Sequence, residues 1–180
     1  MTRAIERPSP SEHDAYYSIY IDLVPEGDVL EILSTPIETT VDLLASVSPE
    51  LEEHRYAPNK WSVREVVGHV IDVERVFDHW ALTFARCDAA PLPGMEQDEY
   101  AAASNAAVRP LAELAAELAV VRQSTLTLFR GLSDDAWTRT GMASGFSFTV
   151  RCFPFIIAGH EIHHRKGLME NYLLPRSRMT

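Results

Sequence analysis

The chain has 180 residues, of which 46% are hydrophobic and 23% are charged, as expected for one soluble domain with a real core. Its formal net charge of −10 argues against a nucleic-acid partner and against an anionic membrane surface, because both attract clustered basic groups. No apolar run approaches the ~20 residues that cross a bilayer, and the first residues lack the apolar stretch of a signal peptide. The two cysteines form no metal-binding or disulfide pattern. We therefore expect a cytoplasmic protein with reduced thiols.

Residues 1–27 are predicted to form an N-terminal arm that packs aromatic side chains on the main body. The segment contains several prolines and the cluster Tyr16, Tyr17 and Tyr20, and Ser11 is a candidate cap for a short helix through Ile21. Residues 28–174 are predicted to form the main domain, and residues 175–180 a C-terminal tail.

Two capping boxes predict the first two long helices. The run from Thr35 to Glu38 has threonine as cap, proline at the first helical position and glutamate three residues after the cap. Residues 28–33 are then a preceding turn, or part of the same helix kinked at Pro36. A second box, from Ser62 to Glu65, precedes an apolar stripe of about six turns that ends near Arg86.

The second half of the chain predicts two more helices after a long connection. Residues 87–109 are rich in proline, glycine and alanine and are long for a loop, so we expect a crossover along the bundle or a lid. Pro110 begins a third helix that Gly131 ends. Residues 138–146 are predicted to be a loop, and Ser147 to cap a last helix that reaches about residue 173. Pro154 should bend this helix or mark a 3₁₀ start. No strand-like alternation is evident, so the fold class is all-α, a four-helix bundle.

Three histidines are candidate ligands for one divalent metal ion. His160 and His164 lie four residues apart, so their imidazoles leave the same face of the last helix. His69 lies on the apolar stripe of the second helix and should point into the bundle, where a neutral imidazole needs a partner. Alone, each would more often be structural. Helix spacing of about 8–10 Å allows imidazoles from two helices to reach one ion, especially if these helices run antiparallel.

Two other interpretations of the histidines stay open at this point. His163 could pair with His160, although we expect it to point about 100° away from His164 and to be a neighbouring or surface group. The run from His160 to His164 also fits the H-E-x-x-H pattern of zinc proteases. Few residues follow it, however, and no strand that could hold a peptide substrate precedes it.

The sequence resembles the DinB-like (YfiT-like) metal-binding four-helix proteins over roughly residues 25–174. The matching segments are 56–62, 65–69 and 72–75 around His69, 91–94 and 97–100 in the long connection, and 158–164 around the histidine pair. The resemblance implies a bundle whose second and third helices are joined by a long crossover, and often a dimer. It also implies a metal site of His69, His160 and His164. Asn59, where glycine is common, and Pro154 depart from the pattern without removing a ligand.

Characterised relatives in that family include transferases that use bacillithiol or mycothiol, so the resemblance implies a metal-dependent S-transferase or hydrolase acting on a small molecule. Zinc or nickel is the expected metal, and three neutral ligands would leave its charge available to activate a thiol or water. Candidate neighbours of the site are Glu65, Asp72, Glu161, His163 and Tyr100, with Gln97 beside Tyr100 as a possible lid. The alternative is a non-catalytic metal- or small-molecule-binding stress protein.

Overall fold

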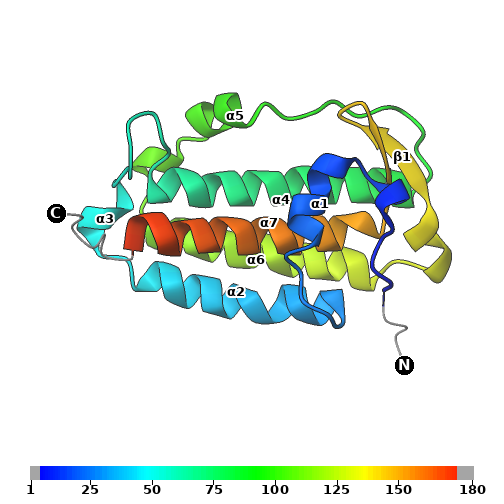
Figure 1. Ribbon diagram of the computed structural model, residues 1–180, viewed down its shortest axis with the longest axis horizontal. Coiled ribbons are helices and arrows are strands. Elements are labelled where there is room, and N and C mark those ends of the chain that lie inside the picture. Colours follow the sequence, from blue (N-terminus) through cyan, green and yellow to red (C-terminus); the bar gives the residue numbers. More distant parts are fainter. Residues whose placement is uncertain (1–4, 174–180) are drawn as a thin grey trace.

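Four long helices form a bundle in the computed structural model, which describes residues 5–173 (Figure 1). They are α2 (Val29–Ala45), α4 (Val63–Ala85), α6 (Leu111–Arg130) and α7 (Cys152–Leu168). Each packs on two neighbours in the order α2, α6, α4, α7 and back to α2. Helices α4 and α6 run in one direction and α2 and α7 in the other, which confirms the predicted bundle and its antiparallel α4 and α7 (Figure 1). Within residues 5–173 no helix combines the length and apolarity needed to cross a membrane.

The parallel direction of α4 and α6 requires the chain to return along the whole bundle between them. Residues 86–110 make this return, and they contain the short helices α5 (Gln97–Ala103) and η3 (Ala106–Val108) (Figure 1). The crossover is therefore confirmed, although it is partly helical. It begins beside a two-stranded hairpin of β1 (Thr140–Ala143) and β2 (Phe146–Thr149), where Leu92 pairs with Ala143.

Because of this hairpin, the predicted loop at 138–146 and the predicted helix cap at Ser147 are wrong. Ser147 pairs with Met142 across the hairpin, and the turn uses Ser144 and Gly145, both with positive φ. The strands have only four residues each, too few for alternation to stand out in the sequence. Helix α7 consequently begins at Cys152, and Pro154 falls in its first turn, where a missing N–H costs no hydrogen bond and no bend is needed.

The first helix also begins earlier than its capping box predicts. Asp28 caps α2 by accepting a hydrogen bond from the backbone N–H of Leu30 at 2.9 Å. The backbone then stays helical through residue 36, so a start at Thr35 is wrong and the alternative, that the residues before it belong to the same helix, is confirmed. At α4 the prediction is confirmed, because Ser62 and Glu65 form the reciprocal capping box.

The N-terminal arm forms three short turns of helix, η1 (Pro10–Glu12), η2 (Ala15–Tyr17) and α1 (Ser18–Ile21). Of these, α1 packs on α7 and η1 packs on β2. Ser9 and Asp14, not Ser11, are the caps of η1 and η2. Tyr17 and Tyr20 are buried, as predicted for the aromatic cluster, whereas Tyr16 is exposed. The remaining elements are α3 (Pro49–Glu52), η4 (Asp134–Thr138) and the π-turn η5 (Met169–Leu173). The predicted tail at 175–180 lies outside the described residues.

A polar layer divides the core into two apolar clusters. One cluster lies at the hairpin end and includes Phe77, Phe129 and Phe153, and the other lies at the opposite end and includes Val66 and Leu118. The buried polar residues that fall between them along the four helices are Thr40, His69, Glu74, Arg122, Thr125, His160 and Glu161. Burying such groups costs free energy unless they are paired, so this layer is the candidate functional site.

Candidate metal centre

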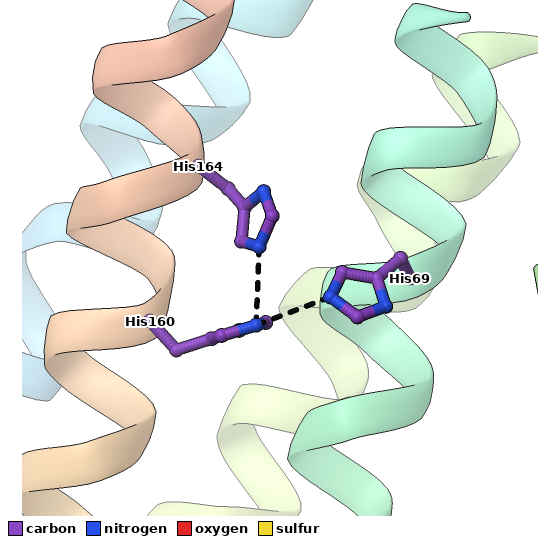
Figure 2. Close-up of side chains that lie close together, drawn as sticks. All are labelled: His69, His160 and His164. Carbon is purple, nitrogen blue, oxygen red and sulfur yellow. Dashed lines mark hydrogen bonds between the residues drawn. The ribbon is translucent and has the colours of Figure 1, made fainter. Parts of the chain in front are cut away.

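The three predicted histidines meet at one point between α4 and α7 (Figure 2). The Nε2 atom of His160 lies 3.2 Å from Nε2 of His69 and 3.1 Å from Nε2 of His164. One ligand atom from each residue falls within 4.8 Å of the others. The i, i+4 spacing places the pair one above the other on α7, and antiparallel packing brings α4 to the same height.

The donor set fits a metal ion better than it fits a hydrogen-bonded cluster. A neutral imidazole Nε2 carries either one hydrogen or one lone pair, so His160 cannot make two full hydrogen bonds to His69 and His164. Four ligands arranged tetrahedrally about 2.0–2.1 Å from a zinc ion would be about 3.3 Å apart. The two measured separations are close to that value, and the cluster can therefore hold a divalent cation.

Burial keeps all three imidazoles in the form that binds metals. Burial lowers the pKa of His69 to about 4, an effect that the carboxylate of Asp98 partly opposes. Burial, together with His69 and His163, lowers the pKa of His164 to about 3, and burial drives the pKa of His160 well below its ordinary value. Uncharged imidazoles at neutral pH offer lone pairs without needing to lose a proton.

Aromatic rings fix the orientation of the cluster. Trp61 packs on the ring of His69 with centroids 4.7 Å apart, and Tyr20 of the arm meets the ring of His160 edge-on at 5.2 Å. The Nδ1 atom of His69 is buried without a hydrogen-bond partner among the described residues. Ligating imidazoles usually donate from the second nitrogen to a carboxylate or carbonyl, and within residues 5–173 no protein group does this for His69.

Comparison with known proteins shows the family of the chain and agrees with its fold. Residues 33–167 match the family model of the DinB superfamily. The chain belongs to the DinB superfamily. Among solved structures, it is similar to YfiT from Bacillus subtilis, described as a probable metal-dependent hydrolase with an unusual four-helix bundle topology. The TM-score is 0.67 with 16% identity, over 92% of this chain and 90% of that one, which supports the fold. No curated protein matches the chain.

Several of the residues predicted to surround the DinB-type site are engaged elsewhere. Glu65 caps α4 and pairs with Arg55 at 2.6 Å, so none of its described bonds reaches His69. Asp72 is half-buried 3.9 Å from Arg75, and burial raises its pKa. Tyr100 is exposed on α5 and does not line the cavity beside the cluster.

Glu161 is buried, but its partners are not the histidines. Its carboxylate accepts from Thr40 at 2.5 Å and pairs with Arg122 at 2.6 Å. Arg122 also binds Glu74 in a two-point contact at 2.8 and 2.9 Å and donates to the carbonyl of Leu33 at 2.9 Å. This network joins all four helices. Sequence reasoning missed it, although charged residues within the apolar stripes at positions 74 and 122 were its signal.

A cavity of about 590 Å³ opens beside the histidines at the end of α7. His163 and His164 line it, together with Trp61 and the first residues of α5, Gln97 and Asp98. Its other walls combine apolar or aromatic side chains with polar ones, and the polar ones are Asn59, Lys60, Lys166, Glu170 and Asn171. His163 thus faces the cavity, and its ring lies 5.1 Å from that of His164. The residues of the crossover that reach the site are Gln97 and Asp98, one turn before the predicted Tyr100.

Proposed function

We propose that this protein is a metal-dependent enzyme that transfers a low-molecular-weight thiol to a small electrophile, with His69, His160 and His164 as the metal ligands. The observation that carries the proposal is the convergence of three uncharged imidazoles at a large polar cavity. Zinc or nickel suits a set of nitrogen ligands. Such an ion, when bound, would supply the positive charge that lowers the pKa of a thiol or of water.

The residues of the chain would position the reactants. Amide and lysine side chains at Asn59, Lys60 and Asn171 offer hydrogen bonds and charge to the carboxylates and hydroxyls of a polar thiol. The cavity volume of about 590 Å³ is within the usual range for small-molecule sites, roughly 300–1,000 Å³. Trp61 and Tyr20 shield the ligating rings from water, which strengthens electrostatic effects at the site.

Hydrolysis is the second candidate, because it needs the same ligand set with water as the nucleophile. The description of YfiT as a probable metal-dependent hydrolase supports it. A hydrolase would bind its substrate in the same cavity, and transfer is placed first because the amide and lysine side chains there suit a polar thiol. A metal-binding protein without catalysis is the third outcome, and the reactions described next would distinguish it.

The test begins with elemental analysis of the protein purified without added metal. His69→Ala and His164→Ala should each lose most of the metal, whereas His79→Ala, an exposed histidine of α4, should retain it. The loaded protein is then assayed with cysteine, bacillithiol and mycothiol against a reactive alkyl halide. Full metal retention in both ligand variants would refute the site, and bound metal without any thiol transfer would refute the proposed reaction.

A further inference from the structure

A second, smaller cavity reaches the histidine cluster from the side of the N-terminal arm. Its volume is about 110 Å³, and His160 is the member of the cluster that lines it. Most of its other lining residues are hydrophobic, while Gln97 and Ser144 are polar, and five of the lining side chains are aromatic: Tyr16, Tyr17, Tyr20, Phe77 and Trp80. Three of these five belong to the arm, so the arm builds a wall of this cavity in addition to covering the bundle.

The two cavities lie on opposite sides of the cluster along the bundle axis. On α4 the polar cavity touches Val66 and the aromatic cavity touches Val73, and His69 lies between these positions. On α7 the polar cavity begins at His163, whereas the aromatic cavity touches His160. Gln97 at the start of α5 lines both cavities. The cluster therefore separates a polar space from an aromatic one.

We propose that the aromatic cavity binds the apolar part of the electrophile, while the polar cavity binds the thiol, so that the two substrates approach the cluster from opposite sides. This inference rests on the proposed function. A water-soluble thiol gains little from an aromatic pocket, whereas an alkyl or benzyl group gains free energy there by leaving water. The arm, through Tyr17 and Tyr20, then determines which electrophiles react.

The volume of the aromatic cavity limits the size of the apolar group that it can bind. An engineered apolar cavity of about 150 Å³ holds one benzene molecule. The present volume is smaller, but the cavity opens to solvent beside Tyr16, which is 56% exposed. One small ring or a short alkyl chain is thus the largest apolar group expected. With an alkyl halide, the thiolate sulfur forms a bond to carbon, the carbon–halogen bond breaks and the halide leaves with its electron pair, the thiol proton having passed to solvent.

The test uses fluorobenzene, because fluorine NMR follows its binding directly and does not depend on catalytic activity. Val76 is a half-buried residue of α4 that lines the cavity, so Val76→Phe should fill it and weaken fluorobenzene binding at least about tenfold. Val120→Phe is the matched control, because Val120 is 70% exposed on α6, and it should bind like the wild type. Met95→Phe, from the crossover wall, provides a second filling variant if Val76→Phe does not fold.

Kinetics with benzyl chloride then separate the two substrates. Val76→Phe should raise the KM for benzyl chloride at least about tenfold and leave the KM for the thiol unchanged. Failure of the wild type to bind fluorobenzene, or equal binding by wild type and the filling variants, would overturn the aromatic site. Fluorobenzene binding that Val76→Phe abolishes, in a protein that transfers no thiol, would support the aromatic site and refute the proposed function instead.

Discussion

Arg122 on α6 lies 2.6 Å from the carboxylate of Glu161, the residue that follows the candidate ligand His160 on α7. Because the same guanidinium binds Glu74 on α4, one side chain ties together the two helices that supply the histidines. Arg122 and Glu74 are 1% and 2% exposed, so the pairing takes place away from water. Glu74 lies little more than one turn after His69, and Glu161 directly follows His160, so the network fixes the spacing of the metal centre.

Arg122→Met should destabilise the protein by about 3–5 kcal/mol, because it leaves Glu74 and Glu161 buried without their counter-charge. Urea unfolding at neutral pH measures the loss. Arg75→Met is the control, since Arg75 is half-exposed and its pair with Glu117 should contribute at most about 1 kcal/mol. Equal effects of the two substitutions would show that the buried network does not stabilise the bundle in this way.

Asp78 is expected to carry a proton at the edge of the same network. The hydroxyl of Thr125 lies 2.7 Å from a carboxylate oxygen of Glu74 and 2.7 Å from one of Asp78. A hydroxyl has one hydrogen, so both contacts are favourable only if one of the two carboxyls donates a proton to Thr125. Because Glu74 is paired with Arg122, Asp78 is the expected donor. Burial raises the pKa of Asp78 to about 7, which agrees with this arrangement.

The raised pKa predicts how Asp78→Asn changes the pH dependence of stability. The protonated carboxyl stabilises the fold fully below the unfolded pKa of about 3.9, and this contribution is lost as the pH rises through about 7. Relative to the wild type, Asp78→Asn should therefore gain about 2 kcal/mol between pH 5 and pH 8. Urea unfolding at both values measures the difference, and a constant difference would mean that Asp78 is ionised throughout.

The sequence predicted the bundle because its signals are long and repeated. The apolar stripe of α4 and its Ser62–Glu65 capping box gave the helix that carries His69, and the spacing of His160 and His164 gave a shared face. Signals that depend on a few residues were less informative. The capping box at Thr35 is not used, because Asp28 begins the helix two turns earlier, and the short hairpin at 140–149 has too few residues to show a period.

The surroundings of the site could not be predicted because they depend on contacts between distant segments. Glu65 and Asp72 are near His69 in sequence, yet Glu65 caps the helix and pairs with Arg55. Gln97 was predicted as part of a lid, but the other residues that approach the site, Asp98 and Tyr20, come from the crossover and the arm and were not. Which segment packs over a helix face is decided by tertiary structure, and periodicity carries no information about it.

Gly159 lets the arm approach α7, and a matched pair of glycines tests this. A Cβ atom at Gly159 would lie 2.0 Å from the carbonyl oxygen of Tyr20, whereas a Cβ at Gly167 of the same helix meets nothing within 4 Å. Gly159→Ala should displace the arm and lower stability by about 1–3 kcal/mol. Gly167→Ala should raise stability by up to about 1 kcal/mol, because alanine favours a helix.

Thermal unfolding and limited chymotryptic cleavage after the exposed Tyr16 measure both effects. Faster cleavage of the arm in Gly159→Ala, with unchanged cleavage in Gly167→Ala, is the expected result. Equal protection of the arm in the two variants would show that its packing does not require glycine at position 159.

The metal-free protein should lose stability in mild acid because its histidines are buried in the uncharged form. The pKa values of about 4 for His69 and about 3 for His164 lie below the unfolded value of about 6.5, so the unfolded chain binds more protons as the pH falls. Each residue should reduce stability by on the order of 2 kcal/mol between pH 7 and pH 5.

Urea unfolding with a chelator present measures this loss, and His164→Leu should lose about 2 kcal/mol less than the wild type over that interval. His79→Ala should match the wild type, since His79 is exposed. An identical acid response in His164→Leu would mean that His164 is already accessible to protons in the folded state.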